Sequence, residues 1–300
     1  METFKYSIII PHRNSIDLLN RAINSIPKRT DSQIIIADNS DVELSYSDIR
    51  TDSLHIRIIH TPQSRGAGGA RNEGILVAKG AHILFLDADD YFTENAFEYF
   101  DEYVDAGYDI VFYKWESCYS DTLEKSNRDI FYNSFLDEYL ANPENDDNIR
   151  YRLDTPCGKM FSSKFLRDNI ILFDECHACN EGFFSMKTGY YARNIHVSNK
   201  VVYCATVSKG SINNRRTIQH LESRFLANLR INQFIKEKGI KIKRPIIRLI
   251  LDARAYGLRE SIRFIKIALS YGVNPITGII YILTKKKKMK ISINEKYITK

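Results

Sequence analysis

This 300-residue sequence lacks the patterns of a disulfide framework, a transmembrane helix and a secretory signal. Its five cysteines are an odd number, which argues against a disulfide framework and for a reducing compartment. No run of about eighteen apolar residues occurs, so no transmembrane helix is expected. The first residues lack a charged leader followed by a long apolar region, so no secretory signal is expected. The sequence predicts a cytoplasmic protein, with peripheral attachment to the cytosolic face of a membrane as an alternative.

Charge of one sign is concentrated at one end of the chain. The formal net charge is +6, and residues 284–300 alone hold seven lysines and one glutamate. Such a basic segment indicates an anionic partner, either nucleic acid or a membrane surface that carries anionic lipids. No recognised nucleic-acid-binding motif accompanies the lysines, so nucleic acid is disfavoured. An anionic inner-membrane surface is the expected partner of this kind.

Strand and helix patterns alternate over the first hundred residues. Strands are predicted at 6–10, 33–37, 55–60 and 82–86. One helix, capped by Ser15 and closed by Pro27, follows the first strand, and a second is predicted at 69–78. This alternation predicts right-handed βαβ units and a mainly parallel, Rossmann-like α/β sheet flanked by helices. Polar clusters at 11–14, 38–41 and 87–90 follow three of the strands and should meet at one edge of the sheet.

The rest of the chain divides into ordered segments and one irregular segment. Further elements are predicted as a helix at 93–106, a strand at 109–113, ordered structure at 153–165 and a strand at 195–207. Residues 116–150 are polar and are interpreted as an irregular excursion or lid. From about residue 219 to 269 the pattern is helical. We expect an α/β catalytic domain at 1–215 and a helical C-terminal extension with a basic tail at 216–300.

The strand at 82–86 ends in three carboxylates, Asp87, Asp89 and Asp90. Carboxylates this close repel one another unless a cation or hydrogen-bond donors compensate. Their hard oxygen atoms suit Mg²⁺ or Mn²⁺ carrying a diphosphate. A solvated acidic turn is the alternative interpretation.

Several motifs occur in a characteristic order: SIIIPHRN (7–14), ADNSD (37–41) and GAGGARNEGILVAKGAHILFLDADD (66–90). PCGKMF (156–161), FDE (173–175) and NEGFF (180–184) follow them. Together they resemble the family 2 glycosyltransferases of the GT-A fold, over roughly residues 5–210. The combination of Ala-Arg-Asn-x-Gly with Phe-Leu-Asp-x-Asp-Asp is the part of the resemblance that is most specific to this family.

The resemblance implies roles for individual residues. Donor binding is assigned to Pro11, Arg13, Asp38, Arg71, Asp87 and Ala88. Among these, Asp38 would accept a hydrogen bond from uracil, and Arg71 would face the base or the phosphates. Asp89, with Asp87, would hold the divalent cation, and Asp90 would support the turn.

The resemblance also assigns the catalytic base. Glu181 stands where the family has an aspartate, with Glu175 or Asp174 as alternatives. The alternative interpretation of Glu181 is a structural one, in which its charge stabilises the start of a helix. Gly66, Gly68 and Gly69 would either let the backbone approach a ligand or simply make a turn.

The function implied is inverting transfer of a sugar from a nucleotide-sugar donor, most plausibly UDP-linked, to a hydroxyl of a glycan or lipid-linked saccharide acceptor. The setting would be synthesis of a surface polysaccharide such as capsule or O-antigen. Two rivals remain. A nucleotidyltransferase is disfavoured because no lysine-rich phosphate loop lies near residue 13. A non-catalytic, nucleotide-sugar-binding subunit is supported by the Asn180-Glu181 departure from the family pattern.

The C-terminal extension has its own apolar pattern. Helical spacing places most of a set of eight residues on one broad face: Ile246, Ile250, Leu251, Ala253, Leu258, Ile262, Ile265 and Leu269. Such a face is usually core or an oligomer interface. A basic amphipathic helix lying on a membrane is the sharper hypothesis. The apolar run 279–283 and the lysines 285–288 strengthen it.

Overall fold

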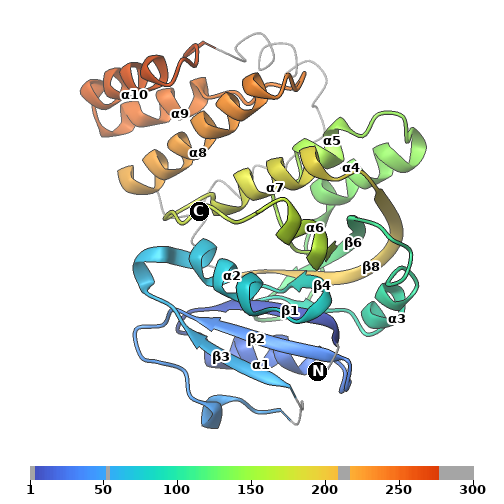
Figure 1. Ribbon diagram of the computed structural model, residues 1–300. Helices are drawn as coiled ribbons and strands as arrows, with labels where there is room; N and C mark the ends of the chain where they lie inside the picture. Colours follow the sequence, from blue (N-terminus) through green and yellow to red (C-terminus); the bar gives the residue numbers. More distant parts are fainter. Residues whose placement is uncertain (1–3, 52–54, 209–216, 277–300) are drawn as a thin grey trace. The chain divides into compact units, whose positions relative to one another are not determined.

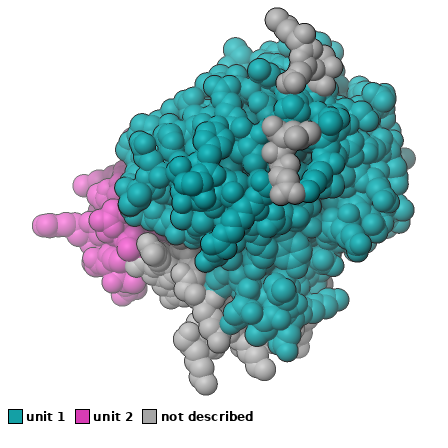
Figure 2. All heavy atoms as spheres, turned by 90° about the horizontal axis from the view of Figure 1, so that it is seen from below, with its two compact units in different colours: residues 1–215 teal, residues 216–300 magenta. Residues whose placement is uncertain are grey.

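The computed structural model describes residues 4–51, 55–208 and 217–276 (Figure 1). The chain divides into two compact units, residues 1–215 and residues 216–300, which Figure 2 shows in different colours. Each unit has a hydrophobic core of its own. No helix among the described residues is both long and apolar enough to cross a membrane.

Unit 1 is built on an eight-stranded sheet in the order β3-β2-β1-β4-β7-β6-β8-β5. The strands are β1 (Phe4–His12), β2 (Ser32–Asp38), β3 (Ile56–His60), β4 (Gly80–Phe85), β5 (Tyr91–Phe92), β6 (Ile110–Tyr119), β7 (Lys159–Ser162) and β8 (Ile195–Val207). The first four in spatial order are parallel, as predicted. In the other half β7 runs antiparallel to both β4 and β6, whereas β8 is parallel to β6. The sheet is therefore mixed, and its parallel half carries the predicted polar edge.

Helices cover this sheet (Figure 1). They are α1 (Ile16–Asn24), α2 (Gly66–Val77), α3 (Ala96–Asp101), α4 (Asp129–Ala141), α5 (Asp147–Tyr151), α6 (Ser163–Asp168) and α7 (Asn180–Tyr191). The prediction of an irregular lid over 116–150 is wrong, because β6 continues to Tyr119 and α4 and α5 follow. Three side chains of α4 are buried in the core at helical spacing, Tyr132, Phe135 and Leu136. The polar majority of that segment is the solvent face of ordered structure.

Two further boundaries differ from the sequence prediction. The helix predicted over 93–106 ends at Asp101, and the chain continues in turns closed by hydrogen bonds from Tyr103 to Phe100 and from Ala106 to Tyr103. The glycine-rich segment before residue 69 is not a separate turn, because α2 already begins at Gly66. Its glycines therefore belong to the first turns of a helix.

Strand burial explains why the polar clusters meet at one edge. Ile8 to Ile10, Ile34 to Ile36 and Ile83 to Leu86 are all buried, so these strands are covered on both faces. The first polar side chains after them emerge where β1, β2 and β4 end. Because the three strands are parallel and adjacent, those ends lie at the same edge of the sheet.

Unit 2 contains three helices in its described part, α8 (Ile218–Glu237), α9 (Ile247–Asp252) and α10 (Leu258–Ser270). Its core is centred on Phe225 and Phe264, whose rings stack at 4.4 Å. The apolar run 279–283 and the lysines 285–288 lie outside the described residues.

The prediction of one broad apolar face in this unit is wrong. Three of its members, Ile246, Ile250 and Ala253, are buried. The other five are exposed: Leu251, Leu258, Ile262, Ile265 and Leu269. The helical pattern is interrupted at Gly257, whose φ of 116° ends one segment before α10 begins. The residues before and after this break therefore do not share one continuous helical face.

Candidate active site

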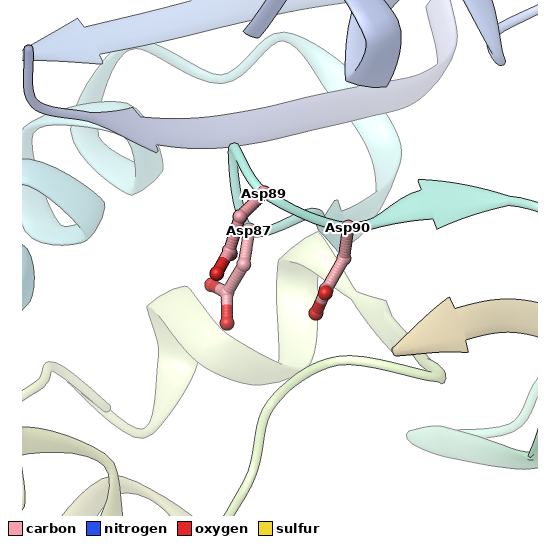
Figure 3. Close-up of side chains that lie close together, drawn as sticks. All are labelled: Asp87, Asp89 and Asp90. Carbon is pink, nitrogen blue, oxygen red and sulfur yellow. The ribbon is translucent and has the colours of Figure 1, made fainter. Parts of the chain in front are cut away.

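The three carboxylates that follow β4 form a cluster. One oxygen from each of Asp87, Asp89 and Asp90 lies within 4.8 Å of the others. In the described part of the chain, no other group of three or more His, Cys, Asp or Glu side chains could hold a metal ion. Figure 3 shows Asp87 and Asp89 close together, with Asp90 projecting from further along the turn. Clustered carboxylate oxygens fit the hard-ligand preference of Mg²⁺ and Mn²⁺.

The members of this cluster differ in what they contact. Asp90 is buried and accepts hydrogen bonds from the Tyr203 hydroxyl and the Thr206 N–H, both at 2.6 Å. Burial and the charges of Asp89 and Asp87 raise the pKa of Asp90 to about 7. Asp90 therefore supports the turn, as predicted, and leaves two carboxylates for a cation.

Asp87 and Asp89 keep acceptor capacity. About a third of the Asp87 side chain is exposed, and one of its oxygens is paired with Arg71. Among the described residues, none other than Asp89 itself, through its own backbone N–H, donates a hydrogen bond to the Asp89 carboxylate. The protein atoms that surround it and the charge of Asp87 raise the pKa of Asp89. A bound cation would remove the repulsion between the two groups.

Arg71 joins this cluster to the start of α7. Its guanidinium donates to Asp87 Oδ1 at 2.7 Å and to Asn180 Oδ1 at 2.9 Å, and it lies 5.3 Å from the centroid of the Phe173 ring. The side chain is buried, and its Nε–H has no hydrogen-bond partner. Burial opposes its charge, but the carboxylates of Asp87 and Glu181 outweigh burial and raise the pKa of Arg71. Arg71 is therefore a fixed cation within the site.

Glu181 is the second residue of α7 and is half-buried. Burial raises the pKa of its carboxyl; the charge of Arg71 opposes this, and the charges of Asp87 and Asp154 add to it. Its own backbone N–H is the donor to this carboxylate, and no other described residue donates a hydrogen bond to it. A carboxylate with a raised pKa and free oxygens has the properties of a general base.

Glu175, the alternative base, is engaged elsewhere. Arg65 donates two hydrogen bonds to it, at 2.8 and 2.5 Å, and Asn72 donates a third at 3.2 Å. The hydrogen bonds from Arg65 outweigh the effect of burial and lower the pKa of Glu175. A carboxylate held in this way is a weak base, so Glu175 is a poorer candidate than Glu181. Its hydrogen bonds instead connect the segment before α7 to α2.

Asp38 lies at the end of β2 and is buried. Its Oδ1 accepts from His12 Nδ1 at 2.8 Å and from the Ser40 hydroxyl at 2.6 Å, while Oδ2 accepts from the Leu44 N–H at 3.0 Å. Because the Ser15 N–H donates to His12 Nε2, the imidazole proton lies on Nδ1. Burial would raise the pKa of Asp38, but these hydrogen bonds outweigh it and lower the pKa.

The remaining predicted donor residues lie at the same edge. Pro11 pairs in register with Ala37 at the ends of β1 and β2. Arg13 is exposed and lies 3.3 Å from Asp41. Ala88 is half-buried between the two candidate metal ligands. The structure thus brings the predicted residues of β1, β2 and β4 to one edge and joins that edge, through Arg71, to the helix of Glu181.

Two glycines at the start of α2 allow close packing against the chain before α7. A Cβ on Gly68 would lie 2.1 Å from the Asp174 carbonyl oxygen, and one on Gly66 would lie 3.2 Å from that of Cys176. Residues 174–176 lead directly into α7. These contacts give the two glycines a packing role that neither of the predicted alternatives included. They let the chain before α7 approach α2, and this approach places Asn180 against Arg71.

Sequence reasoning missed the partners that hold the site. Asn180 is 109 positions from Arg71, and Tyr203 is 113 positions from Asp90. No local spacing signals such pairs. A cavity of about 940 Å³ lies elsewhere in unit 1, at the end of β4 that bears His82, and Tyr108, Tyr190 and Arg193 contribute to its lining. It contains none of the predicted site residues.

Comparisons with known proteins agree with this geometry. Residues 7–169 match the family model for glycosyl transferase family 2. A poly(ribitol-phosphate) beta-N-acetylglucosaminyltransferase, TarS of Staphylococcus aureus, is 26% identical over 216 residues, which cover 69% of this chain and 36% of that protein. A poly(ribitol-phosphate) beta-glucosyltransferase of Bacillus spizizenii is 29% identical over 204 residues, covering 65% and 31%. The chain therefore spans about a third of the length of these relatives.

A shorter match and two solved structures complete the comparison. WfgD of Escherichia coli, a UDP-Glc:alpha-D-GlcNAc-diphosphoundecaprenol beta-1,3-glucosyltransferase, is 29% identical over 101 residues, covering 33% of this chain and 40% of that protein. S. aureus TarS 1–349 in complex with UDP-GlcNAc superposes with a TM-score of 0.64 at 20% identity, covering 98% of this chain and 78% of that one. The mannosyltransferase PcManGT of Pyrobaculum calidifontis, in complex with GDP-Man and Mn²⁺, gives 0.51 at 15%, covering 98% and 83%. These likenesses confirm the predicted GT-A fold.

Proposed function

Because this chain belongs to glycosyl transferase family 2, we propose that it transfers a sugar from a UDP-linked donor to a hydroxyl group of a glycan acceptor, with inversion at the anomeric carbon. The observation that carries the proposal is the Arg71 bridge. It joins Asp87 at the end of β4 to Asn180, the neighbour of Glu181. Candidate metal ligands and a candidate base thus flank one buried cation. The solved complex of a relative with UDP-GlcNAc supports the donor class.

Asp89 and Asp87 would hold a divalent cation, Mn²⁺ or Mg²⁺. Their oxygens are of the type these ions prefer, and the charge of Asp87 contributes to the raised pKa of Asp89. Such an ion neutralises charge on the leaving diphosphate. The neighbouring fold solved with GDP-Man and Mn²⁺ supports this choice.

Glu181 would act as the base. Its carboxylate accepts the proton of the acceptor hydroxyl while that oxygen forms a bond to the anomeric carbon. The bond from this carbon to the phosphate oxygen breaks, and the nucleoside diphosphate leaves with the electron pair. An α-linked donor then gives a β-linked product without a covalent enzyme intermediate. The proton on Glu181 is afterwards released to solvent.

The other predicted residues would hold the donor. Pro11 and Arg13 after β1, Asp38 after β2 and Ala88 after β4 lie at the edge where nucleotides bind in open α/β sheets. Arg71 fixes Asp87 in place while its charge favours an anionic ligand nearby. We place the nucleoside along this edge and the diphosphate at the Asp87–Asp89 end.

The acceptor is proposed to be a lipid-linked saccharide or a growing surface polysaccharide. The name of WfgD includes a diphosphoundecaprenol-linked acceptor, and TarS is named for poly(ribitol phosphate). A lipid carrier would place the reaction at a membrane. We therefore propose a cytoplasmic location with peripheral contact to the cytosolic face of the inner membrane.

The test is release of the nucleotide from a panel of nucleotide sugars by the full chain, with Mn²⁺, Mg²⁺ or EDTA. We expect metal-dependent release of UDP from one sugar, and loss of release in Asp89→Asn. Asp121→Asn, which removes an exposed carboxylate from a turn of unit 1, is the matched control.

Other outcomes would separate the rival functions. Donor binding without transfer to any offered acceptor would favour a non-catalytic, nucleotide-sugar-binding subunit. Release of pyrophosphate from a nucleoside triphosphate would favour a nucleotidyltransferase. Absence of nucleotide binding across the panel would overturn the proposal.

A further inference from the structure

Helix α10 carries a stripe of exposed apolar side chains that its own unit does not use. Leu258, Ile262, Ile265 and Leu269 are exposed by 66%, 45%, 36% and 60%. Their spacing of four, three and four residues places them on one face of the helix. The stripe is about 16 Å long at 1.5 Å per residue. A continuous apolar face on the surface of a small folded unit indicates an interaction site.

The fold of unit 2 uses a different face of α10. Ser261, Phe264 and Ala268 are buried, and Phe264 stacks on Phe225 of α8. The Ser261 hydroxyl donates to the Ile250 carbonyl at 3.0 Å. Because these contacts anchor the helix, the exposed stripe is not needed to hold it in place. Loss of the stripe should therefore leave the unit folded.

The charges around the stripe select an anionic partner. Arg259 and Lys266 on α10 are exposed, and each follows a residue of the stripe, so both lie along the same border of it. Neither forms an ion pair or hydrogen bond with any described residue. By contrast, the acidic side chains Glu222 and Glu260 are both paired with Arg263. The two charged side chains that border the stripe and have no partner are therefore both positive.

We propose that the exposed stripe of α10, with Arg259 and Lys266 beside it, is a docking surface for a membrane that contains anionic lipids. Apolar side chains bordered by Lys and Arg are the pattern of helices that lie in the membrane interface. A second copy of the chain fits less well, because pairing two such faces would bring the unpaired cations together. The proposal rests on the proposed function, since a lipid-linked acceptor would give this attachment its use.

The experiment is co-sedimentation of the full chain with phosphatidylcholine vesicles that contain or lack phosphatidylglycerol, at low and high salt. We expect binding to the anionic vesicles, weaker binding at high salt and little binding to neutral ones. Equal binding to both kinds of vesicle, or none to either, would overturn the proposal. Concentration-dependent association that is abolished by changing the stripe would assign it to a second copy of the chain.

Paired variants separate the apolar and electrostatic contributions. Leu258→Gln/Leu269→Gln changes the two most exposed members of the stripe and should weaken binding by about tenfold or more. Arg259→Gln/Lys266→Gln should have an effect of about the same size and should remove most of the salt dependence.

A matched control comes from unit 1. Leu76 and Ile130 are exposed by 66% and 54%, and Leu76→Gln/Ile130→Gln should bind vesicles as the wild type does. Unchanged binding in the α10 variants, or equal loss in this control, would overturn the proposal. Circular dichroism checks that each variant folds. Donor binding in the absence of vesicles is measured separately, so that failure of membrane docking is distinguished from failure of the proposed transfer.

Discussion

The two units of this chain differ in the sign of their charge and in which charges they leave unpaired. Residues 1–215 contain 23 Lys and Arg against 32 Asp and Glu, whereas residues 216–300 contain 20 against 5. In unit 1 the carboxylates of Asp89, at the sheet edge, and Glu181, on α7, form no ion pair with a described residue. In unit 2 the cations Arg259 and Lys266 are without such a pair. Each unit thus exposes charge of the sign that its proposed partner neutralises, a divalent cation in one and anionic lipid in the other.

Within unit 1, the acidic groups with a structural role also differ from the candidate functional ones in their hydrogen-bond donors. Glu175 is held by two hydrogen bonds from Arg65, and Asp90 is buried with two donors of its own. Asp89 and Glu181 have no hydrogen-bond donor from another described residue. Repulsion and desolvation that are not offset inside the protein leave these two groups ready to interact with a ligand. The comparison of the units is therefore a statement about chemistry as well as about net charge.

The change with the largest expected effect is Asp89→Asn. If Asp89 holds the cation, loss of its charge removes several kcal/mol of transition-state stabilisation, which is about a thousandfold or more in rate. Initial rates of UDP release at saturating Mn²⁺ would measure this. Binding of the variant to anionic vesicles should be unchanged. A variant that loses vesicle binding but keeps transfer would break the assignment of chemistry to unit 1.

Glu181→Gln tests the base. We expect transfer to fall by about 10²- to 10⁴-fold while donor binding is retained, because the amide cannot accept the acceptor proton. Glu94→Gln, an exposed change in the same unit, is the control. Unchanged transfer in Glu181→Gln would show that another group is the base.

The pH dependence of the wild type has a defined sign. Burial, with the charges of Asp87 and Asp154, raises the pKa of Glu181 despite the opposing charge of Arg71. The base must be ionised to work, so transfer should fall as the pH drops through this raised pKa, above the usual glutamate value of about 4.3. An acid limb at or below that value would contradict the burial argument.

Gly68→Ala distinguishes packing from ligand approach. The new Cβ would meet the Asp174 carbonyl, so the chain before α7 must move away from α2. Overpacking of this kind costs about 1–3 kcal/mol, measurable as a lower midpoint of thermal unfolding. Donor binding should weaken only to the extent that the hydrogen bond between Arg71 and Asn180 is lost. Wild-type stability with abolished donor binding would restore the ligand-approach interpretation of the glycine.

The parallel half of the sheet could be predicted because two sequence signals coincide at each of its central strands. Strands β1, β2 and β4 each combine a buried apolar run with a polar exit, so both their existence and their shared edge could be inferred. Strand β7 has four residues, too few for a periodic signal, and its antiparallel pairing was not predicted. In α4 the abundance of polar residues hid three buried positions at helical spacing.

The candidate site could be predicted only in part, because its residues are far apart along the chain. The sequence marks the carboxylates after β4 and suggests Glu181. It carries no trace of the contact between Arg71 and Asn180, which depends on how closely α2 and the chain before α7 approach. In unit 2, the apolar periodicity predicted one face for residues that lie on two separate helices, before and after the break at Gly257. Three-dimensional packing decides such cases, and local patterns do not encode it.

The smallest predicted effect concerns the way unit 2 neutralises its few acidic groups. Arg263 donates to both oxygens of Glu222, at 2.6 and 3.0 Å, and to Glu260 at 2.8 Å. The groups are about a third exposed, so solvent screens them, and Arg263→Gln should cost only about 0.5–1 kcal/mol of stability at neutral pH. Thermal unfolding would show a midpoint lower by a few degrees. Arg254→Gln, an exposed arginine with no ion pair among the described residues, is the control.

The pH dependence of that small effect is its sharper test. The hydrogen bonds from Arg263 lower the pKa of Glu222 in the folded protein. A group with a lowered folded pKa contributes stability above its unfolded pKa of about 4.3 and loses it as the pH falls through the folded value. The difference between Arg263→Gln and wild type should therefore be full at neutral pH and vanish in acid. A difference that persists unchanged in acid would mean that Arg263 stabilises unit 2 by packing, and that its acids are not neutralised as the comparison of the two units requires.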